Sequence, residues 1–381
     1  MAVTWPAGVR SSGVAAGIKD AGQADLGIVA LDEPGAWAGT FTRSGAAAAP
    51  VVWSRSLLGG PLQAVVVNSG NANACTGAAG RAAVEETVRA TAAALGCAER
   101  SVAVASTGPI GIPLPVAKVL HGIPSAVQHL SSGVGDFARA ILTTDTRPKV
   151  AARSRDGFEV VGVAKGAAML APNMATMLAF VATDARCDAG ALQDLLTKAV
   201  RTTFDRVDVD GCQSTNDSVF LLSSGDAGPA DPRELATAVA EVCADLAEQM
   251  VRDAEGGSRL VRVRVTGADD EATAERLARG VAASALWRAA VYGGDPNWGR
   301  VVAALGAADP RLDLSRVTLS IGPEEVFRGG EPAGSLAAAA AAMADGDVTV
   351  SCVVGDAPVA VEVLTSDLSP AYVTLNAGGM S

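Results

Sequence analysis

Thr176 is the first residue whose chemistry needs attention, because its hydroxyl stands where a loop-like sequence meets an apolar run. Residues 165–175 (KGAAMLAPNMA) contain glycine, proline and asparagine, and residues 178–182 (LAFVA) are apolar. This pattern predicts a loop-to-strand junction. A β-branched threonine at such a junction is typical of a strand, so the hydroxyl is a nucleophile only if neighbouring groups activate it.

A histidine that could activate this hydroxyl is not evident from the sequence. The chain has two histidines, His121 and His129, and neither stands beside an obvious nucleophile. A serine- or cysteine-type triad needs a histidine held near its nucleophile, so that chemistry is disfavoured. The six cysteines are scattered without a CxxC pair and none neighbours a histidine. The sequence therefore predicts no metal site.

The residues around Thr176 resemble the self-cleavage motif of the ornithine acetyltransferase family, also called glutamate N-acetyltransferases. The resemblance implies that the chain cuts itself between Ala175 and Thr176, which leaves residues 1–175 as an α chain and residues 176–381 as a β chain. The freed Thr176 is then the expected catalytic nucleophile. Its own α-amine, with a reference pKa of about 7.7–8.0, is the expected acceptor of the hydroxyl proton.

A second segment, residues 106–111 (STGPIG), is similar to the oxyanion-hole segment of the same family. The resemblance implies that the Thr107 hydroxyl and the Gly108 N–H stabilise the negative charge that develops on the reacting carbonyl oxygen. Pro109 has no N–H, but the implied donor is that of Gly108, so the role is retained. Without the resemblance, the segment predicts a turn that ends a strand over 101–106.

Substrate-contacting positions of the family are also matched. Thr143 heads the segment 143–149 (TTDTRPK), in which Asp145 is interpreted as structural. Lys165 matches a lysine that can bind a substrate carboxylate, and Glu255, in VRDAEGG, matches a carboxylate that can bind the ammonium of ornithine. Taken without the family, the same residues fit a surface lysine and an acidic turn.

The C-terminus matches the family in part. Asn376 and Ser381 keep the spacing of two further substrate contacts. Gly378 and Gly379 replace an acidic residue and a tyrosine of the family, and two glycines loosen a tail that is expected to close over the substrate.

The elements that position these residues alternate between short β-rich runs and alanine-rich helical windows. The pattern lacks a regular βαβ repeat and favours a layered α/β or α+β fold. The resemblance implies an αββα-like sandwich of two packed sheets, with a smaller second domain within about residues 230–345. The predicted strands are 64–68, 101–106, 158–163, 178–183, 260–265 and two within 348–363, and the predicted helices are 82–95, 189–202, 233–251 and 269–290.

Composition excludes several classes of protein. Hydrophobic residues make up 49% and charged residues 19% of 381 residues, as expected of a compact globular chain. The net charge of −11 and the pI of about 4.8 disfavour nucleic acid as a partner, and no basic cluster suggests a membrane surface. The N-terminal residues lack a secretory pattern and the cysteines fit reduced thiols, so a cytoplasmic location is expected.

The resemblance implies acetyl transfer from N2-acetyl-L-ornithine to L-glutamate in arginine biosynthesis, by a ping-pong route through an acetyl ester of Thr176. It implies no cofactor, although acetyl-CoA serves some members of the family as a co-substrate. It also implies that the cleaved chains stay together in an α4β4 or smaller oligomer. Two alternatives remain open at this point: a self-processed amidase or aminopeptidase with the same Thr176 nucleophile, and an unprocessed ligand-binding relative without catalysis.

Overall fold

The computed structural model describes residues 3–20, 22–169, 177–344 and 346–377, which form two compact units. The first unit contains the described residues up to Asp205 together with Cys212–Met250. The second contains Arg206–Gly211 and the described residues from Val251 onward. Each unit has its own sheet and its own hydrophobic core.

The sheet of the first unit has the strand order β4-β3-β2-β8-β7-β6-β5, and β1 pairs with β2. Strand β2 changes partners along its length: residues 26–30 pair with β1 and β3, and residues 36–41 pair with β8. A register shift lies between Ala30 and Gly35, and Gly35 still pairs with Leu62 of β3 before the β8 pairing begins. The strands are β1 (Val9–Val14), β2 (Leu26–Phe41), β3 (Leu62–Ser69), β4 (Val102–Thr107), β5 (Lys149–Arg155), β6 (Phe158–Lys165), β7 (Leu178–Arg186) and β8 (Ser218–Pro229).

The two halves of this sheet enclose one core. Val65 and Val67 of β3 belong to the same buried cluster as Phe180 of β7 and Phe220 of β8. The rings of Phe180 and Phe220 stack with their centroids 5.5 Å apart. Because side chains alternate along each strand, the opposite faces of the two halves are left for helices to cover.

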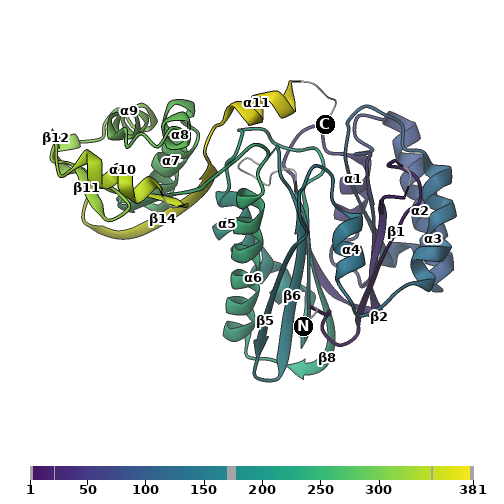
Figure 1. The fold of residues 1–381 in the computed structure, drawn as a ribbon. Coiled ribbons are helices and arrows are strands. Elements are labelled where there is room, and N and C mark those ends of the chain that lie inside the picture. Colours follow the sequence, from purple (N-terminus) through teal and green to yellow (C-terminus); the bar gives the residue numbers. More distant parts are fainter. Residues whose placement is uncertain (1–2, 21, 170–176, 345, 378–381) are drawn as a thin grey trace. The chain divides into compact units, whose positions relative to one another are not determined.

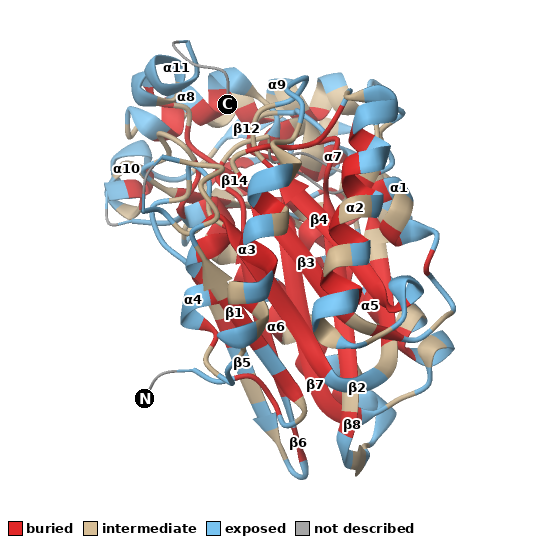
Figure 2. Ribbon diagram, turned by 90° about the vertical axis from the view of Figure 1, so that its right-hand side faces the viewer, coloured by how far each residue is buried: buried red, intermediate tan, exposed pale blue. Residues whose placement is uncertain are grey.

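Helices cover both outer faces of the first unit (Figures 1 and 2). Val88 of α2 and Ile123 of α3 share a cluster with Val66 and Val104 on the outer face of β3 and β4. On the other side α6 lies against β6, where a Cβ added at Gly162 would come within 2.6 Å of a Val242 side-chain atom. This helix–sheet–sheet–helix order confirms the predicted αββα sandwich. The helices are α1 (Ala49–Arg55), α2 (Gly77–Leu95), α3 (Val116–Gln128), α4 (Gly135–Ala140), α5 (Ala189–Thr202) and α6 (Pro232–Arg252).

The second unit is built on a sheet with the order β12-β11-β10-β13-β9-β14. The stretch 269–290 was predicted to be helical, and the structure divides it into two helices, α7 and α8. The helical conformation is interrupted before Ser284, whose hydroxyl accepts the Trp287 N–H and caps the start of α8. The elements are β9 (Leu260–Gly267), β10 (Thr318–Ile321), β11 (Glu324–Arg328), β12 (Glu331–Pro332), β13 (Val348–Val353), β14 (Ala357–Ser366), α7 (Glu271–Ala282), α8 (Ala285–Tyr292), α9 (Trp298–Ala308), α10 (Leu336–Ala344) and α11 (Pro370–Asn376).

Candidate active site

Three of the predicted site residues meet in the first unit, around the ammonium group of Lys165. Lys165 is the last residue of β6 and is 2% exposed. Its Nζ donates to Thr143 Oγ1 at 2.7 Å and to Thr107 Oγ1 at 3.3 Å. The sequence separates these residues by up to 58 positions, and the sandwich brings them into direct contact.

Thr107 and Gly108 lie where β4 ends and the chain turns. Thr107 is buried, and its carbonyl oxygen accepts the Asn71 N–H at 3.0 Å. Gly108 has a φ of +139°, and a Cβ added there would lie 2.4 Å from the Asn71 backbone nitrogen. Only glycine fits this close approach, so the identity of residue 108 is fixed by the path of the backbone.

Asp145 connects the loop before β5 to the end of β6. Its side chain is fully buried, with Oδ1 2.5 Å from Lys149 Nζ and Oδ2 3.7 Å from Lys165 Nζ. Oδ1 also accepts the Gly166 N–H at 2.7 Å, and Oδ2 accepts the Thr143 N–H at 3.2 Å. This carboxylate therefore binds the Thr143 and Gly166 backbone amides as well as two lysines, a role that the sequence interpretation described only as structural.

The charges in this cluster alter one another's protonation. Burial by itself would raise the pKa of Asp145, but the ammonium groups of Lys165 and Lys149 and the Gly166 amide lower it to about 2. For Lys165 the balance is different, because burial lowers its pKa, Asp145 raises it and Lys149 lowers it, with a net lowering. Asp145 is therefore a stable anion, and it partners two buried lysines.

Lys149 was not among the predicted site residues, although the sequence contains a signal for it. The signal is the presence of opposite charges, Asp145 and Lys149, within the one short segment TTDTRPK. Lys149 opens β5 and pairs with Ala164, the residue before Lys165 in β6. The contact therefore depends on the β5–β6 hairpin, and β5 was not predicted from the sequence.

The second unit holds two other predicted site residues. Asn376 Nδ2 donates to Glu255 Oε2 at 3.0 Å and to the Tyr372 carbonyl oxygen at 3.0 Å. The other carboxylate oxygen, Glu255 Oε1, is buried and has no hydrogen-bond partner among the residues described. Glu255 and Asn376 thus contact each other, and their contacts to substrate stay predictions.

The remaining predicted positions, Ala175, Thr176 and Ser381, lie outside the described residues. The described chain resumes at Met177, which is buried and directly precedes β7. Within the ranges described, no group of three or more histidine, cysteine, aspartate or glutamate side chains could hold a metal ion. The helices described in the structure also include none that is long and apolar enough to cross a membrane.

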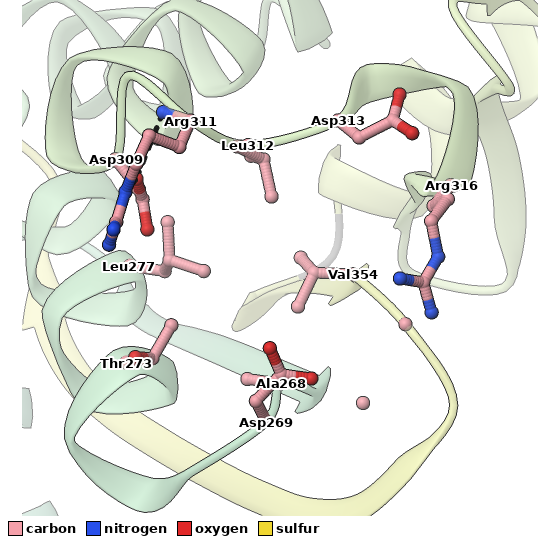
Figure 3. Close-up of a pocket in the computed structure, with 12 residues that line it drawn as sticks. Ala268, Asp269, Thr273, Leu277, Asp309, Arg311, Leu312, Asp313, Arg316 and Val354 are labelled. Atoms are coloured by element: carbon pink, nitrogen blue, oxygen red, sulfur yellow. Dashed lines mark hydrogen bonds and ion pairs between the residues drawn. The ribbon is translucent and has the colours of Figure 1, made fainter.

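A separate cavity of about 350 Å³ lies in the second unit (Figure 3). Leu277, Leu312 and Val354 form its apolar middle, with Arg311 and Arg316 at opposite sides. Two of its three aspartates have partners within the protein: Asp309 pairs with Arg276, and Asp313 accepts from Ser315. This cavity contains none of the predicted site residues, so we place the candidate active site at Lys165.

Comparison with known proteins gives a consistent result across nearly the whole chain. A family model described as the ArgJ family matches residues 10–380. The arginine biosynthesis bifunctional protein ArgJ of Mycolicibacterium paratuberculosis is 46% identical over 390 residues, which cover 98% of this chain and 95% of that protein.

Two solved structures are also similar to parts of the chain. The arginine biosynthesis bifunctional protein ArgJ of Bacillus halodurans is 35% identical with a TM-score of 0.50, and covers 51% of this chain and 96% of its own. Ornithine acetyltransferase of Mycobacterium tuberculosis, solved in complex with ornithine, is 45% identical with a TM-score of 0.43, and covers 45% of this chain and 94% of its own.

Proposed function

The chain belongs to the ArgJ family, and from this premise we propose that it transfers an acetyl group from N2-acetyl-L-ornithine to L-glutamate in arginine biosynthesis. The observation that carries the proposal is the buried cluster in which Lys165 contacts Thr107 and Thr143. Lys165 ends β6, and the sequence that follows it leads to the predicted nucleophile Thr176.

The hydrogen bonds of Lys165 support an oxyanion role for Thr107. An ammonium group has three N–H donors and no acceptor, so each hydroxyl that it contacts must act as the acceptor. The Thr107 hydroxyl proton is then free to point away from Lys165. A hydroxyl arranged in this way, together with the Gly108 N–H, can donate to the negative oxygen of a tetrahedral intermediate.

We propose that Thr176 becomes the nucleophile by self-cleavage at the Ala175–Thr176 bond. The hydroxyl adds to the Ala175 carbonyl carbon, the carbon–nitrogen bond breaks, and water then hydrolyses the resulting ester. The relatives support this step: the Bacillus halodurans polypeptide corresponds to 51% of this chain, whereas the curated relative aligns with 98% of it. A precursor cut near its middle yields chains of that length.

The acetyl transfer then proceeds in two steps. Thr176 takes the acetyl group as an ester and releases ornithine, and glutamate attacks that ester with its α-amine. Both amides formed by the acetyl group are similar in energy, so the exchange requires no cofactor. Lys165 contacts Thr107, Thr143 and Asp145 within the protein, and its positive charge is proposed to attract a substrate carboxylate.

Further parts of the proposal concern contacts and assembly. Glu255, Asn376 and Ser381 are proposed to bind the substrates, with Glu255 facing the ornithine ammonium. The cleaved chains are proposed to stay together in an α4β4 or smaller oligomer in the cytoplasm. Acetyl-CoA is proposed as an alternative acetyl donor, and assays with each donor distinguish it from acetylornithine.

Intact mass under denaturing conditions is the first test. The expected result is two chains, residues 1–175 and 176–381, and a single uncut chain would contradict the proposed nucleophile. Acetyl transfer from acetylornithine is then measured with glutamate or water alone as the acceptor, and acetyl transfer to glutamate is measured separately with acetyl-CoA as the donor. Acetate release that does not depend on glutamate would indicate a hydrolase instead.

A further inference from the structure

Lys19, in the loop between β1 and β2, reaches the segment that carries Thr143. Its Nζ donates to the Leu142 carbonyl oxygen at 2.7 Å and to the Ala24 carbonyl oxygen at 2.9 Å. Leu142 directly precedes Thr143, so the first of these bonds joins two parts of the first unit that are 123 positions apart in the sequence. Lys19 was not among the predicted site residues.

The peptide group between Leu142 and Thr143 is held at both of its polar atoms. Lys19 binds the Leu142 oxygen, and Asp145 Oδ2 accepts the Thr143 N–H at 3.2 Å. A positive group on the oxygen and a negative group on the N–H both form charge-assisted hydrogen bonds, which are stronger than neutral ones. The orientation of this peptide group determines where the Thr143 side chain lies, and Thr143 Oγ1 accepts from Lys165 at 2.7 Å.

The backbone at Lys19 is itself fixed by a buried carboxylate. Asp25 is 0% exposed, and its Oδ1 accepts the Ala16 N–H at 2.6 Å. Its Oδ2 accepts the N–H groups of Ile18 and Lys19 at 2.5 Å and 2.9 Å. The Lys19 side chain therefore extends from a backbone position that three hydrogen bonds to one side chain define.

The stem of Lys19 packs on the backbone beside the predicted oxyanion hole. A Cβ added at Gly70, where φ is +90°, would come within 2.8 Å of Lys19 Cγ, so a larger residue would displace the stem. A Cβ added at Gly108 would in turn come within 2.6 Å of the Gly70 carbonyl carbon. Lys19 thus contacts both the segment that leads to Thr143 and the backbone against which the turn after β4 lies.

The charges around Lys19 place it beside the Lys165 cluster. Burial lowers the pKa of Lys19 below its ordinary value, and the carboxylate of Asp25 acts in the opposite direction. The charge of Lys165 lowers this pKa further, and that of Asp145 raises it. Within the cluster, Thr143 is exposed and Lys165 is 2% exposed, so Thr143 is the part that a substrate can reach.

We propose that Lys19 is a positioning residue of the active site, which holds the Leu142–Thr143 peptide group so that the Thr143 hydroxyl stays on Lys165 and faces the substrate. This inference rests on the proposed function and on the expected contact between Thr143 and the substrate. Because the Thr143 hydroxyl accepts from an ammonium group, its own proton is available to a substrate oxygen. Without Lys19 the peptide group can turn, and this proton loses its fixed direction.

Steady-state kinetics of acetyl transfer test this role. Lys19→Met removes the donor and keeps most of the apolar stem. We expect its KM for acetylornithine to rise about tenfold with little change in kcat, as for loss of one hydrogen bond to the bound substrate. Lys19→Arg keeps N–H donors and should recover most of the wild-type KM. Thermal melting checks that each variant is folded, and the milder Lys19→Gln takes the place of Lys19→Met if that variant does not fold.

A double-mutant cycle shows whether Lys19 acts through Thr143. Thr143→Val alone should raise the same KM by a similar factor. Adding Lys19→Met to Thr143→Val should then cause no further rise, because the hydroxyl that Lys19 positions is already absent. A further rise of about tenfold would mean that Lys19 acts by another route, and it would overturn the inference. An unchanged KM for Lys19→Met alone would overturn it as well.

The matched control is Lys118→Met. Lys118 is an exposed lysine that donates to a carbonyl oxygen of the same loop, that of Gly17, at 2.5 Å, and it contacts no residue of the Lys165 cluster among the hydrogen bonds described. Its KM should equal that of the wild type. Equal rises in KM for Lys118→Met and Lys19→Met would mean that any loosening of the loop disturbs the site, which contradicts a specific role for Lys19.

Crystal structures of the wild type and Lys19→Met provide a measurement that needs no activity. The distance from Thr143 Oγ1 to Lys165 Nζ is 2.7 Å, and in the variant we expect it to exceed the hydrogen-bond range of about 3.5 Å. A contact that persists in the variant would refute the positioning role. A wild-type protein without acetyl transfer would instead refute the proposed function, and the two crystal structures would still decide whether Lys19 holds Thr143 in place.

Discussion

At the scale of single residues, the direction of hydrogen bonds decides what the cluster can do. Lys165 can only donate, so Thr107 and Thr143 must accept from it. Each threonine keeps one proton to give to something else. A site with a lysine behind the hydroxyls therefore presents donors to a substrate oxygen, as acyl transfer requires.

Replacing Thr107 with valine should remove one of these donors and leave the shape of the side chain. We expect kcat for acetyl transfer to fall by about 10²–10³, with little change in KM, because the lost hydrogen bond forms in the transition state. Thr107→Ser retains the hydroxyl and should recover most of the activity. A valine variant with near wild-type kcat would place the oxyanion elsewhere.

Lys149 gives a prediction about pH. Its positive charge lowers the pKa of Lys165, so Lys149→Met should raise that pKa and keep Lys165 protonated to higher pH. The high-pH limb of the kcat profile should therefore move to higher pH. Asp145 should also draw Lys165 towards itself once Lys149 is gone, which lowers kcat. The exposed Lys198→Met is the matched control. An unmoved limb would show that Lys165 does not control it.

At the scale of elements, the turn after β4 depends on glycine in two different ways. A Cβ at Gly108 would lie 2.4 Å from the Asn71 nitrogen, whereas a Cβ at Gly111 would meet no atom within 4 Å. Both residues have positive φ, +139° and +83°. Gly111→Ala should thus cost about 1–2 kcal/mol of strain.

Gly108→Ala should cost more than Gly111→Ala, because the backbone must also move away from Asn71. We expect a lower melting temperature and a loss of kcat for Gly108→Ala, and near wild-type kcat for Gly111→Ala. Calorimetry and the acetyl-transfer assay measure the two effects on the same samples. Equal behaviour of the two variants would show that the close approach to Asn71 is unimportant.

Some helices and strands were predicted from the sequence pattern and others were not. The alanine-rich window 82–95 was predicted as a helix and lies within α2 (Gly77–Leu95). Strand β2 was not predicted, because its sixteen residues include Pro34, Gly35 and Gly39, which usually interrupt strands. The interruption coincides with a register shift between Ala30 and Gly35, after which β2 exchanges β3 for β8 at Ala36.

At the scale of the whole molecule, long-range contacts separate what was predictable from what was not. Family motifs identified Thr107, Thr143 and Lys165 one by one, and the sandwich then brings them into contact. Strand register determines the ion pair between Asp145 and Lys149 and the hydrogen bond that the Met177 N–H donates to Asp217. Local sequence carries little information about register, so these roles emerged only from the folded chain.

The buried anion at Asp145 makes a prediction for the stability of the molecule in acid. Its pKa is about 2 in the folded chain and ordinarily 3.8, so its contribution is present above pH 3.8 and is lost as pH falls through 2. This contribution amounts to roughly 2 kcal/mol. The contribution of Asp217 to stability has the opposite pH dependence. Its pKa is raised in the folded chain, so its protonation favours the folded chain as pH falls towards 3.8.

The Thr176→Ala chain, expected to stay in one piece, suits the measurement by urea unfolding at pH 4 and pH 2. Between these values we expect it to lose about 2 kcal/mol more than the same chain carrying Asp145→Asn and Lys149→Gln, which lacks the pair. The double change removes one negative and one positive charge together. Of the cluster, only Lys165 then remains charged, without the Asp145 carboxylate. The other carboxyl groups titrate in both chains and cancel in the difference. Equal losses would mean that the Asp145 carboxylate is not held ionised by its two lysines.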